Sequence, residues 1–246
     1  MKLKVIGSSS KGNCYILETK TGSLLLDAGV PFKEIQKALG FDLSSVRGCL
    51  VTHEHKDHSK AIKDVMKAGI DVYAPTSCSS LMEAGRIHRF YKIKPGSQFS
   101  VGGFVILAVE AQHDVECLAY LIQYRPTGEK LLYATDTFYL KNKFVGLNYV
   151  LIECNYCKDI LDLNIAEGKI PLTLKNRLLE SHFSLENVKG FLEANDLTKV
   201  RKVILCHLSD GNSDAARMIR EIHELTSKVV EVAEAGKVIE LEMFPF

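Results

Sequence analysis

The sequence predicts one α/β domain in which two β-sheets pack together and helices cover the outside. Strand-like blocks are each followed by helical stretches, and this order occurs twice along the chain. A length of 246 residues suits one large core, and 46% hydrophobic with 25% charged residues is ordinary for a soluble globular protein. We expect a single domain over residues 1–246, because no linker, repeat or low-complexity tract divides it.

The first half of the chain alternates between short apolar strands and helical spacing. Gly40 and Gly69 are helix stop signals, and Ser59 is the expected N-cap of the helix that ends at Gly69. The expected strands are Leu3–Ile6, Cys14–Glu18, Leu24–Asp27, Gly48–Val51 and Asp71–Ala74, and the other expected helices are Phe32–Leu39 and Thr76–Glu83.

The second half begins with a run of β-structure and then returns to alternating strands and helices. A clear turn lies at residues 126–128, where Pro, Thr and Gly follow each other. The expected strands are Phe99–Val101, Phe104–Glu110, Leu118–Tyr124, Lys130–Ala134, Tyr149–Glu153, Val203–Cys206, Val229–Val232 and Val238–Leu241. The expected helices are Pro171–Leu179, Leu185–Ala194 and Asp214–Leu225.

Three histidines and one aspartate fall within six residues, directly after the strand that ends at Val51: His53, His55, Asp57 and His58. In extended backbone, residues two apart point to the same side, so His53 and His55 can bind one ion together. Asp57 and His58 follow as the chain turns into a helix and could address a second ion. The alternative is a polar loop that happens to be rich in histidine. Four ligand-type side chains at this spacing, in a chain with eight histidines, favour a metal site.

This H-x-H-x-D-H pattern resembles the signature of the metallo-β-lactamase superfold, and four further motifs agree with it in order. They are Leu24–Gly29, Gln112–Asp114, Tyr133–Thr137 and Leu205–Ser209. Their joint occurrence is far more specific than any one of them. The resemblance implies a four-layer αββα sandwich built from two similar halves.

The resemblance also implies two divalent metal ions. By position against the family's motifs, the first ion would be held by His53, His55 and His113, the second by Asp57, His58 and His207, and Asp136 would bridge them. Asp27 would orient a ligand through a hydrogen bond. Such a pair lowers the pKa of a shared water, so that a bridging hydroxide attacks the substrate. Zn²⁺, Mn²⁺ and Fe²⁺ all suit these ligands. The competing interpretation makes His113 or His207 a hydrogen-bonded core histidine.

Two segments resemble one branch of this family, the WalJ/YycJ-like phosphodiesterases and exonucleases. Glu153–Tyr156 is similar to the branch's E-x-N-Y segment, and Arg177–Ser184 to its R-x-x-x-(S/G)-H-x-S element. Ser181 stands where a glycine is usual, and Cys157 where an acidic residue is common. The interval from Asp136 to His207 is too short for the large inserted domain of the β-CASP nucleases.

Asp57 and His182 are the candidate catalytic residues. His182 lies just before a predicted helix with Ser184 as N-cap, where it could meet an anionic group or protonate a leaving alkoxide. It could equally be a helix-start histidine that faces solvent. The candidates for substrate contact are Ser9, Lys11, Asn13, Asn155, Arg177 and Ser184. Against them, the loop at residues 7–13 has the composition of an ordinary turn, and a single basic residue is often a solvated surface charge.

The seven cysteines show no scaffold-like spacing, so we expect them to be mostly reduced and buried in a cytoplasmic protein. Cys154 and Cys157 form a lone C-x-x-C without a second pair, which favours coincidence over a zinc or redox site. The start of the chain reads as a strand and not as a signal peptide, and no apolar run is long enough to span a bilayer.

We therefore expect a binuclear metal-dependent hydrolase, a phosphodiesterase or nuclease that acts on DNA. The alternatives are a hydrolase of small thioesters, lactones or cyclic phosphodiesters at the same metals, and a metal-binding regulator without catalysis. The formal charge of +1 provides no global attraction to nucleic acid or to anionic membranes, so any polyanion site must be a local patch. The expected partner is nucleic acid or a small phosphodiester, with no membrane. The sequence does not determine the oligomeric state.

Overall fold

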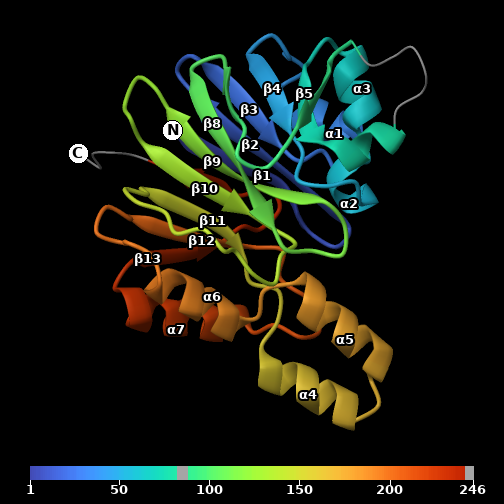
Figure 1. Cartoon of the computed structure of the whole chain (residues 1–246), viewed down its shortest axis with the longest axis vertical. Helices are drawn as coiled ribbons and strands as arrows, with labels where there is room; N and C mark the ends of the chain where they lie inside the picture. The colour runs from blue at the N-terminus through green and yellow to red at the C-terminus, as the bar shows by residue number, and fades with distance from the viewer. Residues whose placement is uncertain (82–87, 242–246) are drawn as a thin grey trace.

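The computed structural model describes residues 1–81 and 88–241, and within them two seven-stranded sheets lie face to face (Figure 1). The first sheet comprises β1 (Lys2–Ser9), β2 (Gly12–Thr19), β3 (Gly22–Leu26), β4 (Val46–Leu50), β5 (Val72–Pro75), β6 (Phe90–Ile93) and β14 (Val238–Glu240). Its strand order is β14-β1-β2-β3-β4-β5-β6. The last strand, β14, pairs antiparallel with β1, so the chain closes on the sheet where it began.

The second sheet repeats this plan. It comprises β7 (Gln98–Val101), β8 (Phe104–Ala111), β9 (Cys117–Tyr124), β10 (Lys130–Ala134), β11 (Tyr149–Glu153), β12 (Lys202–Cys206) and β13 (Val229–Val232). Its order is β13-β12-β11-β10-β9-β8-β7. In each sheet antiparallel strands adjoin a run of parallel ones, β3 to β6 in the first and β10 to β13 in the second.

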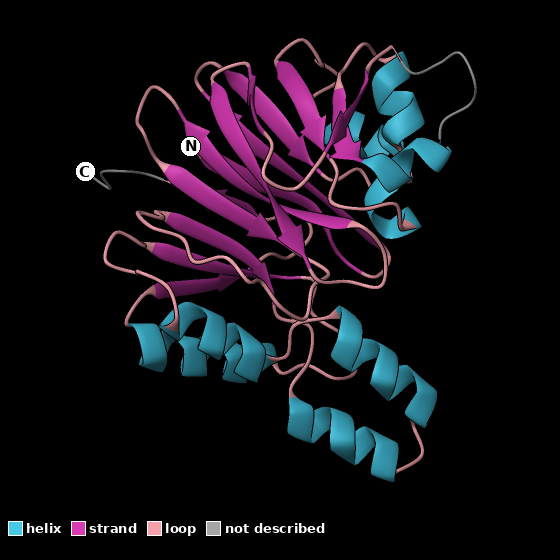
Figure 2. Ribbon diagram, viewed as in Figure 1, coloured by secondary structure: helices cyan, strands magenta, loops and turns pink. Residues whose placement is uncertain are grey.

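Helices cover the outer faces of the two sheets, as Figure 2 shows. On the first sheet lie α1 (Phe32–Ala38), α2 (Lys56–Ser59), α3 (Ile62–Lys67) and the 3-10 helix η1 (Thr76–Leu81). On the second lie α6 (Leu185–Glu193) and α7 (Ala215–Thr226). The pair α4 (Lys158–Ala166) and α5 (Leu172–Ser181) projects from the body (Figure 1).

Three apolar layers separate the four layers of secondary structure. One lies between the sheets, and the other two lie between each sheet and its helices. The three successive leucines of β3 illustrate the arrangement: Leu24 and Leu26 belong to the layer between the sheets, and Leu25 packs on the helix side. A strand buried on both faces has no solvent side, so it is apolar throughout. The predicted four-layer αββα sandwich is confirmed.

Several local predictions differ from the structure. Ser59 is not an N-cap but the last residue of α2, and its hydroxyl donates to the Glu54 carbonyl at 2.8 Å. Strand β6 and helix α4 were not predicted. The predicted helix Thr76–Glu83 is a 3-10 helix to Leu81, and its end at Glu83 lies outside the described residues. No helix in residues 1–81 and 88–241 is long and apolar enough to cross a membrane.

Candidate metal centre

The candidate ligands gather where strands of both sheets end. Asp27 follows β3, His53 follows β4, Asp136 comes two residues after the end of β10, and His207 comes directly after β12. Parallel strands present their carboxyl ends at one edge of a sheet, and ligands of α/β proteins bind at that edge. The two sheets therefore bring together side chains that are up to 180 residues apart in the sequence.

The three histidines His53, His55 and His113 form one donor group, whose ligand atoms all lie within 4.8 Å of one another. Their ring centroids are 4.7 to 5.1 Å apart. His113 Nδ1 donates to the Ser181 carbonyl at 2.9 Å, which fixes the ring and leaves Nε2 toward His55. Because Ser181 acts through its backbone carbonyl, this contact does not require the glycine that is usual there.

His53 provides the test of whether a metal ion fits. Burial and the neighbouring His58 hold its pKa well below the usual value, so the ring is neutral. Its Nδ1 lies 3.0 Å from the Thr52 hydroxyl, which in turn donates to Asp27. This leaves Nε2 as a buried lone pair without a hydrogen-bond partner in the described part of the chain. A neutral imidazole with an unused nitrogen is the form that binds a metal, so the group fits a divalent ion.

A second donor group consists of Asp57, His58, Asp136 and His207, again with ligand atoms within 4.8 Å. His58 Nε2 lies 3.1 Å from Asp136 Oδ1, and His207 Nδ1 lies 2.6 Å from the same oxygen. Burial raises the pKa of the Asp136 carboxyl, but the two imidazoles outweigh it and hold that pKa well below its usual range. Burial lowers the pKa of His207, but Asp136 and then Glu153 raise it to about 10. The same concentration of negative charge attracts a cation.

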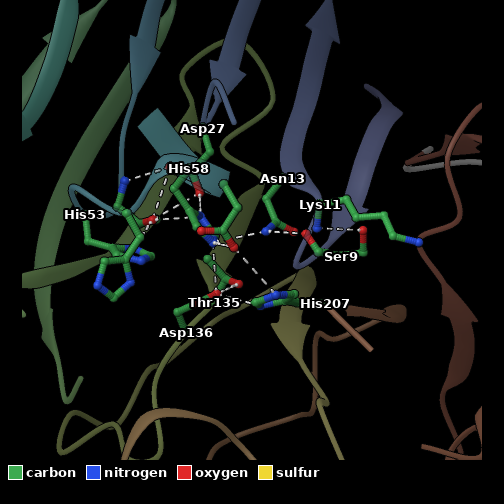
Figure 3. A network of polar contacts seen from close by, with 12 residues as sticks. Ser9, Lys11, Asn13, Asp27, His53, His58, Thr135, Asp136 and His207 are labelled. Atoms are coloured by element: carbon green, nitrogen blue, oxygen red, sulfur yellow. Dashed lines mark hydrogen bonds and ion pairs between the residues drawn. The ribbon is translucent and has the colours of Figure 1, made fainter. Parts of the chain in front are cut away.

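Asp27 lies next to His58, on the side away from Asp136, and contacts it (Figure 3). Its fully buried carboxylate accepts from the Thr52 N–H at 2.7 Å, from the Tyr133 hydroxyl at 2.5 Å and from His58 Nδ1 at 2.7 Å. With Nδ1 held this way, His58 presents Nε2 to the site. That Asp27 orients a metal ligand stays a prediction.

The backbone around the site is constrained. Asp27, Asp136 and His207 have φ values of 57°, 48° and 52°, a left-handed conformation that is costly for residues other than glycine. Gly29 is required for another reason, since a Cβ there would lie 1.6 Å from the Asp57 carbonyl oxygen. This close approach brings the loop after β3 against helix α2, which carries Asp57.

Glu153 is a site residue that was not among the predicted ones. It is fully buried, and its Oε1 lies 2.7 Å from His182 Nδ1 and 3.1 Å from His207 Nδ1. With Asp136, these residues form a third group of possible ligands. A signal was present in the sequence, because Glu153 opens the E-x-N-Y segment at the end of a buried strand.

The site opens to solvent through a cleft of about 440 Å³. His182 lines it, and so do two of the predicted substrate residues, Asn155 and Arg177. Arg177 is exposed, and its Nη2 lies 3.8 Å from Asp114 Oδ2. Asn155 Nδ2 donates to the His207 carbonyl at 2.9 Å, while its buried Oδ1 has no partner among the described residues.

The other predicted substrate residues lie elsewhere. Ser9 and Lys11 line a neighbouring hollow of about 500 Å³, and their neighbour Ser10 faces the cleft instead. Asn13 is fully buried with Nδ2 3.0 Å from His58 Nε2. Ser184 is also fully buried, and its hydroxyl accepts from Asn187 N as the predicted N-cap of α6. That capping role accounts for Ser184 without a substrate contact.

Comparison with known proteins agrees with this geometry. The sequence profile of the β-lactamase superfamily domain matches residues 23–208. The exodeoxyribonuclease WalJ of Streptococcus pneumoniae is 29% identical, over 95% of this chain and 89% of that protein. The exodeoxyribonuclease YycJ of Bacillus anthracis is 28% identical, over 89% and 87%. The crystal structure of the metallo-β-lactamase fold protein YhfI from Bacillus subtilis superposes with a TM-score of 0.75 at 17% identity, covering 97% and 99% of the two chains.

Proposed function

Because this chain belongs to the β-lactamase superfamily and is a metal-dependent hydrolase, we propose that it hydrolyses phosphodiester bonds of DNA. The observation that carries the proposal is the set of residues that meet in one open cleft. Two groups of metal-type donors meet there, the half-buried His182 lies beside them in contact with the buried Glu153, and Arg177 stands at the rim. The similarity to two proteins named exodeoxyribonucleases supports DNA as the substrate.

We assign the donors to two divalent ions. The first ion would be held by His53, His55 and His113, the second by Asp57, His58 and His207, with Asp136 shared between them. Bound there, such ions supply an activated water and neutralise charge on the phosphate. Zn²⁺ and Mn²⁺ are both suited to nitrogen and oxygen ligands.

The chain's own residues then bind and protonate the substrate. Arg177 contacts a phosphate oxygen, since an exposed guanidinium at the cleft rim can make two parallel hydrogen bonds to it. His182 donates a proton to the departing sugar oxygen as the P–O bond breaks. Glu153 holds that imidazole by Nδ1, and the closeness of its carboxylate favours the protonated ring. Asp57 would serve as a ligand of the second ion.

A small phosphodiester is the second candidate substrate. It is favoured by the formal charge of +1, which provides no general attraction for a polyanion. The cleft of about 440 Å³ also lies in the size range of small-ligand sites. The two candidates differ in how activity depends on substrate length.

The experiment that tests the function is digestion of end-labelled single-stranded and double-stranded DNA after loading with Zn²⁺ or Mn²⁺. A cyclic nucleotide and a nitrophenyl phosphodiester are assayed in parallel, and metal content is measured on the same sample. The expected result is shortening of DNA that is lost on chelation and in His53→Ala. Turnover of the small substrates together with intact DNA would overturn DNA in favour of the small phosphodiester.

A further inference from the structure

A hollow of about 480 Å³ lies between helix α6 and the segment 138–143. Two hydrogen bonds fix this segment to the helix. Asn187 Nδ2 donates to the Phe138 carbonyl at 3.3 Å, and Phe144 N donates to Asn195 Oδ1 at 2.7 Å. Asn187 lies in the first turn of α6, and Asn195 lies two residues after its last residue, Glu193. Between the two attachments the segment bows away from α6 and leaves the hollow open.

The hollow has an apolar floor and a basic outer wall. Phe183 and Phe191 are buried at its base with ring centroids 6.3 Å apart. Tyr139 stands on the outer wall with 54% of its surface exposed, so its ring is accessible to a ligand. Lys141 and Lys143 follow it, both exposed, and no ion pair holds either of them among the described residues. Glu186, on the helix side, is the acidic residue of this lining.

The segments that form the two walls of the hollow follow residues of the metal centre closely in the sequence. Tyr139 comes three residues after Asp136, and Phe183 comes directly after His182. The outer wall is also tied to the loop that carries His113. There Phe138 N donates to the Gln112 carbonyl at 3.1 Å, and Gln112 N donates to the Tyr139 carbonyl at 3.3 Å. A polymer whose reacting phosphate lies in the cleft can therefore extend toward Tyr139.

We propose that this hollow binds a nucleotide of a single-stranded nucleic acid, next to the phosphodiester that is cleaved. The inference rests on the proposed function and adds a binding site to it. An unpaired base stacks on the Tyr139 ring above the apolar floor, and Lys141 and Lys143 contact the adjoining phosphates. Exposed aromatic rings interleaved with lysines are how proteins bind single strands without reading their sequence.

The observations favour this occupant over a protein segment. A partner peptide would be expected to fill the apolar floor, but the wall presents two cations with no partner among the described residues and one anion. A paired base cannot stack on Tyr139 without leaving its duplex, which costs a few kcal/mol. The hollow therefore selects single strands, or strand ends that fray readily.

The test is binding of a fluorescein-labelled single-stranded 12-nucleotide DNA with a phosphorothioate backbone, followed by fluorescence anisotropy with the metal-loaded protein. Tyr139→Ala should weaken binding about tenfold, and Tyr139→Phe should keep it, because stacking needs the ring and not the hydroxyl. Lys141→Ala with Lys143→Ala should reduce the slope of log affinity against log salt by about 1.4, as expected for two lost phosphate contacts. A matched control is Lys92→Ala with Lys94→Ala, an exposed pair with the same spacing, with Lys92 in the edge strand β6 and Lys94 directly after it.

Turnover separates this proposal from the proposed function. The Tyr139 and Lys141/Lys143 variants should lose activity on a 12-nucleotide substrate and keep it on bis-nitrophenyl phosphate, which carries no base for Tyr139 and no second phosphate for the lysines. If the wild-type protein digests DNA and these variants match the Lys92/Lys94 control on both substrates, the hollow is not a nucleotide site and the nuclease function stands. If the wild-type protein neither cleaves nor binds single-stranded DNA, both proposals are overturned.

Discussion

The Glu153 carboxylate and the His182 imidazole are joined by a contact of 2.7 Å between Oε1 and Nδ1, beside the metal donors. Glu153 is fully buried, and its second oxygen accepts the backbone N–H groups of Thr137 and Phe183 at 3.1 and 3.2 Å. Burial raises the pKa of the Glu153 carboxyl, but His182 outweighs it and lowers that pKa. These hydrogen bonds thus fix the position of the Glu153 carboxylate. The carboxylate in turn fixes the orientation of His182, which lines the cleft.

Replacing His182 with alanine should retain the metal ions and remove most turnover of DNA. Loss of a general acid usually costs about 10² to 10⁴ in rate, because the leaving sugar oxygen then departs without a proton. A nitrophenyl phosphodiester needs no proton on its leaving group, so its hydrolysis should fall much less. Rates on both substrates and metal content check this. Equal losses on the two substrates would indicate a binding role, and loss of metal would make His182 a ligand.

Replacing Glu153 with glutamine should move the pH dependence of DNA hydrolysis to lower pH. Burial lowers the pKa of His182, but the Glu153 carboxylate more than compensates and raises it. A protonated His182 is present below that raised pKa and is lost as the pH rises through it. Without the Glu153 charge the loss occurs at lower pH. The pH profile of kcat is the measurement, and an unchanged alkaline limb in a folded variant would contradict the role.

Replacing Asp136 with alanine should reduce the metal content from two ions per chain toward one. Asp136 Oδ1 lies 3.1 Å from His58 Nε2 and 2.6 Å from His207 Nδ1, so its removal takes the shared carboxylate out of the second donor group. Elemental analysis after saturation with Zn²⁺ measures this, with Asp64→Ala on the surface of α3 as control. A folded Asp136→Ala protein with both ions would refute the shared role.

Replacing Gly29 with alanine should destabilise the fold by about 3 kcal/mol or more, because the added carbon overlaps backbone that cannot move freely. The nearest atom is the Asp57 carbonyl oxygen at 1.6 Å. The matched control is Gly190→Ala, whose Cβ meets nothing within 4 Å and whose position in a helix favours alanine by about 0.5 to 1 kcal/mol. Urea unfolding measures the stability of both variants. Equal midpoints would show that the loop after β3 and helix α2 can move apart without loss of stability.

Replacing Cys154 and Cys157 with serine should leave hydrolysis within a few-fold of the parent. Both thiols are buried and free, and burial raises their pKa values, so neither is a reactive thiolate near neutral pH. Rate per folded molecule is the measure, since buried serines will lower stability. A collapse of that rate would assign the pair a role in catalysis.

The fold class and the types of residue that could bind metal were predictable from the sequence alone. Strands and helices differ in the spacing of their apolar residues, so two sheets with helices outside could be predicted from local sequence pattern. The triple leucine of β3 was predicted to lie in a strand, and it lies in two apolar layers. The cluster from His53 to His58 could be found because its ligands are adjacent in the chain. Helix α4 was missed, because it projects from the body and only Leu161 is buried along it, so no apolar stripe marked it.

Which residues reach the cleft could be seen only in the tertiary structure. Ser9 and Ser10 are neighbours of one type, yet Ser10 lines the cleft and Ser9 lines the hollow beside it. Glu153 became a site residue only when β11 and the segment after α5 brought its carboxylate to His182, 29 residues away. Ligand type is a property of a single side chain and can be predicted from sequence. Where a side chain points and which residues surround it depend on how distant strand ends meet. No local sequence pattern contains that information.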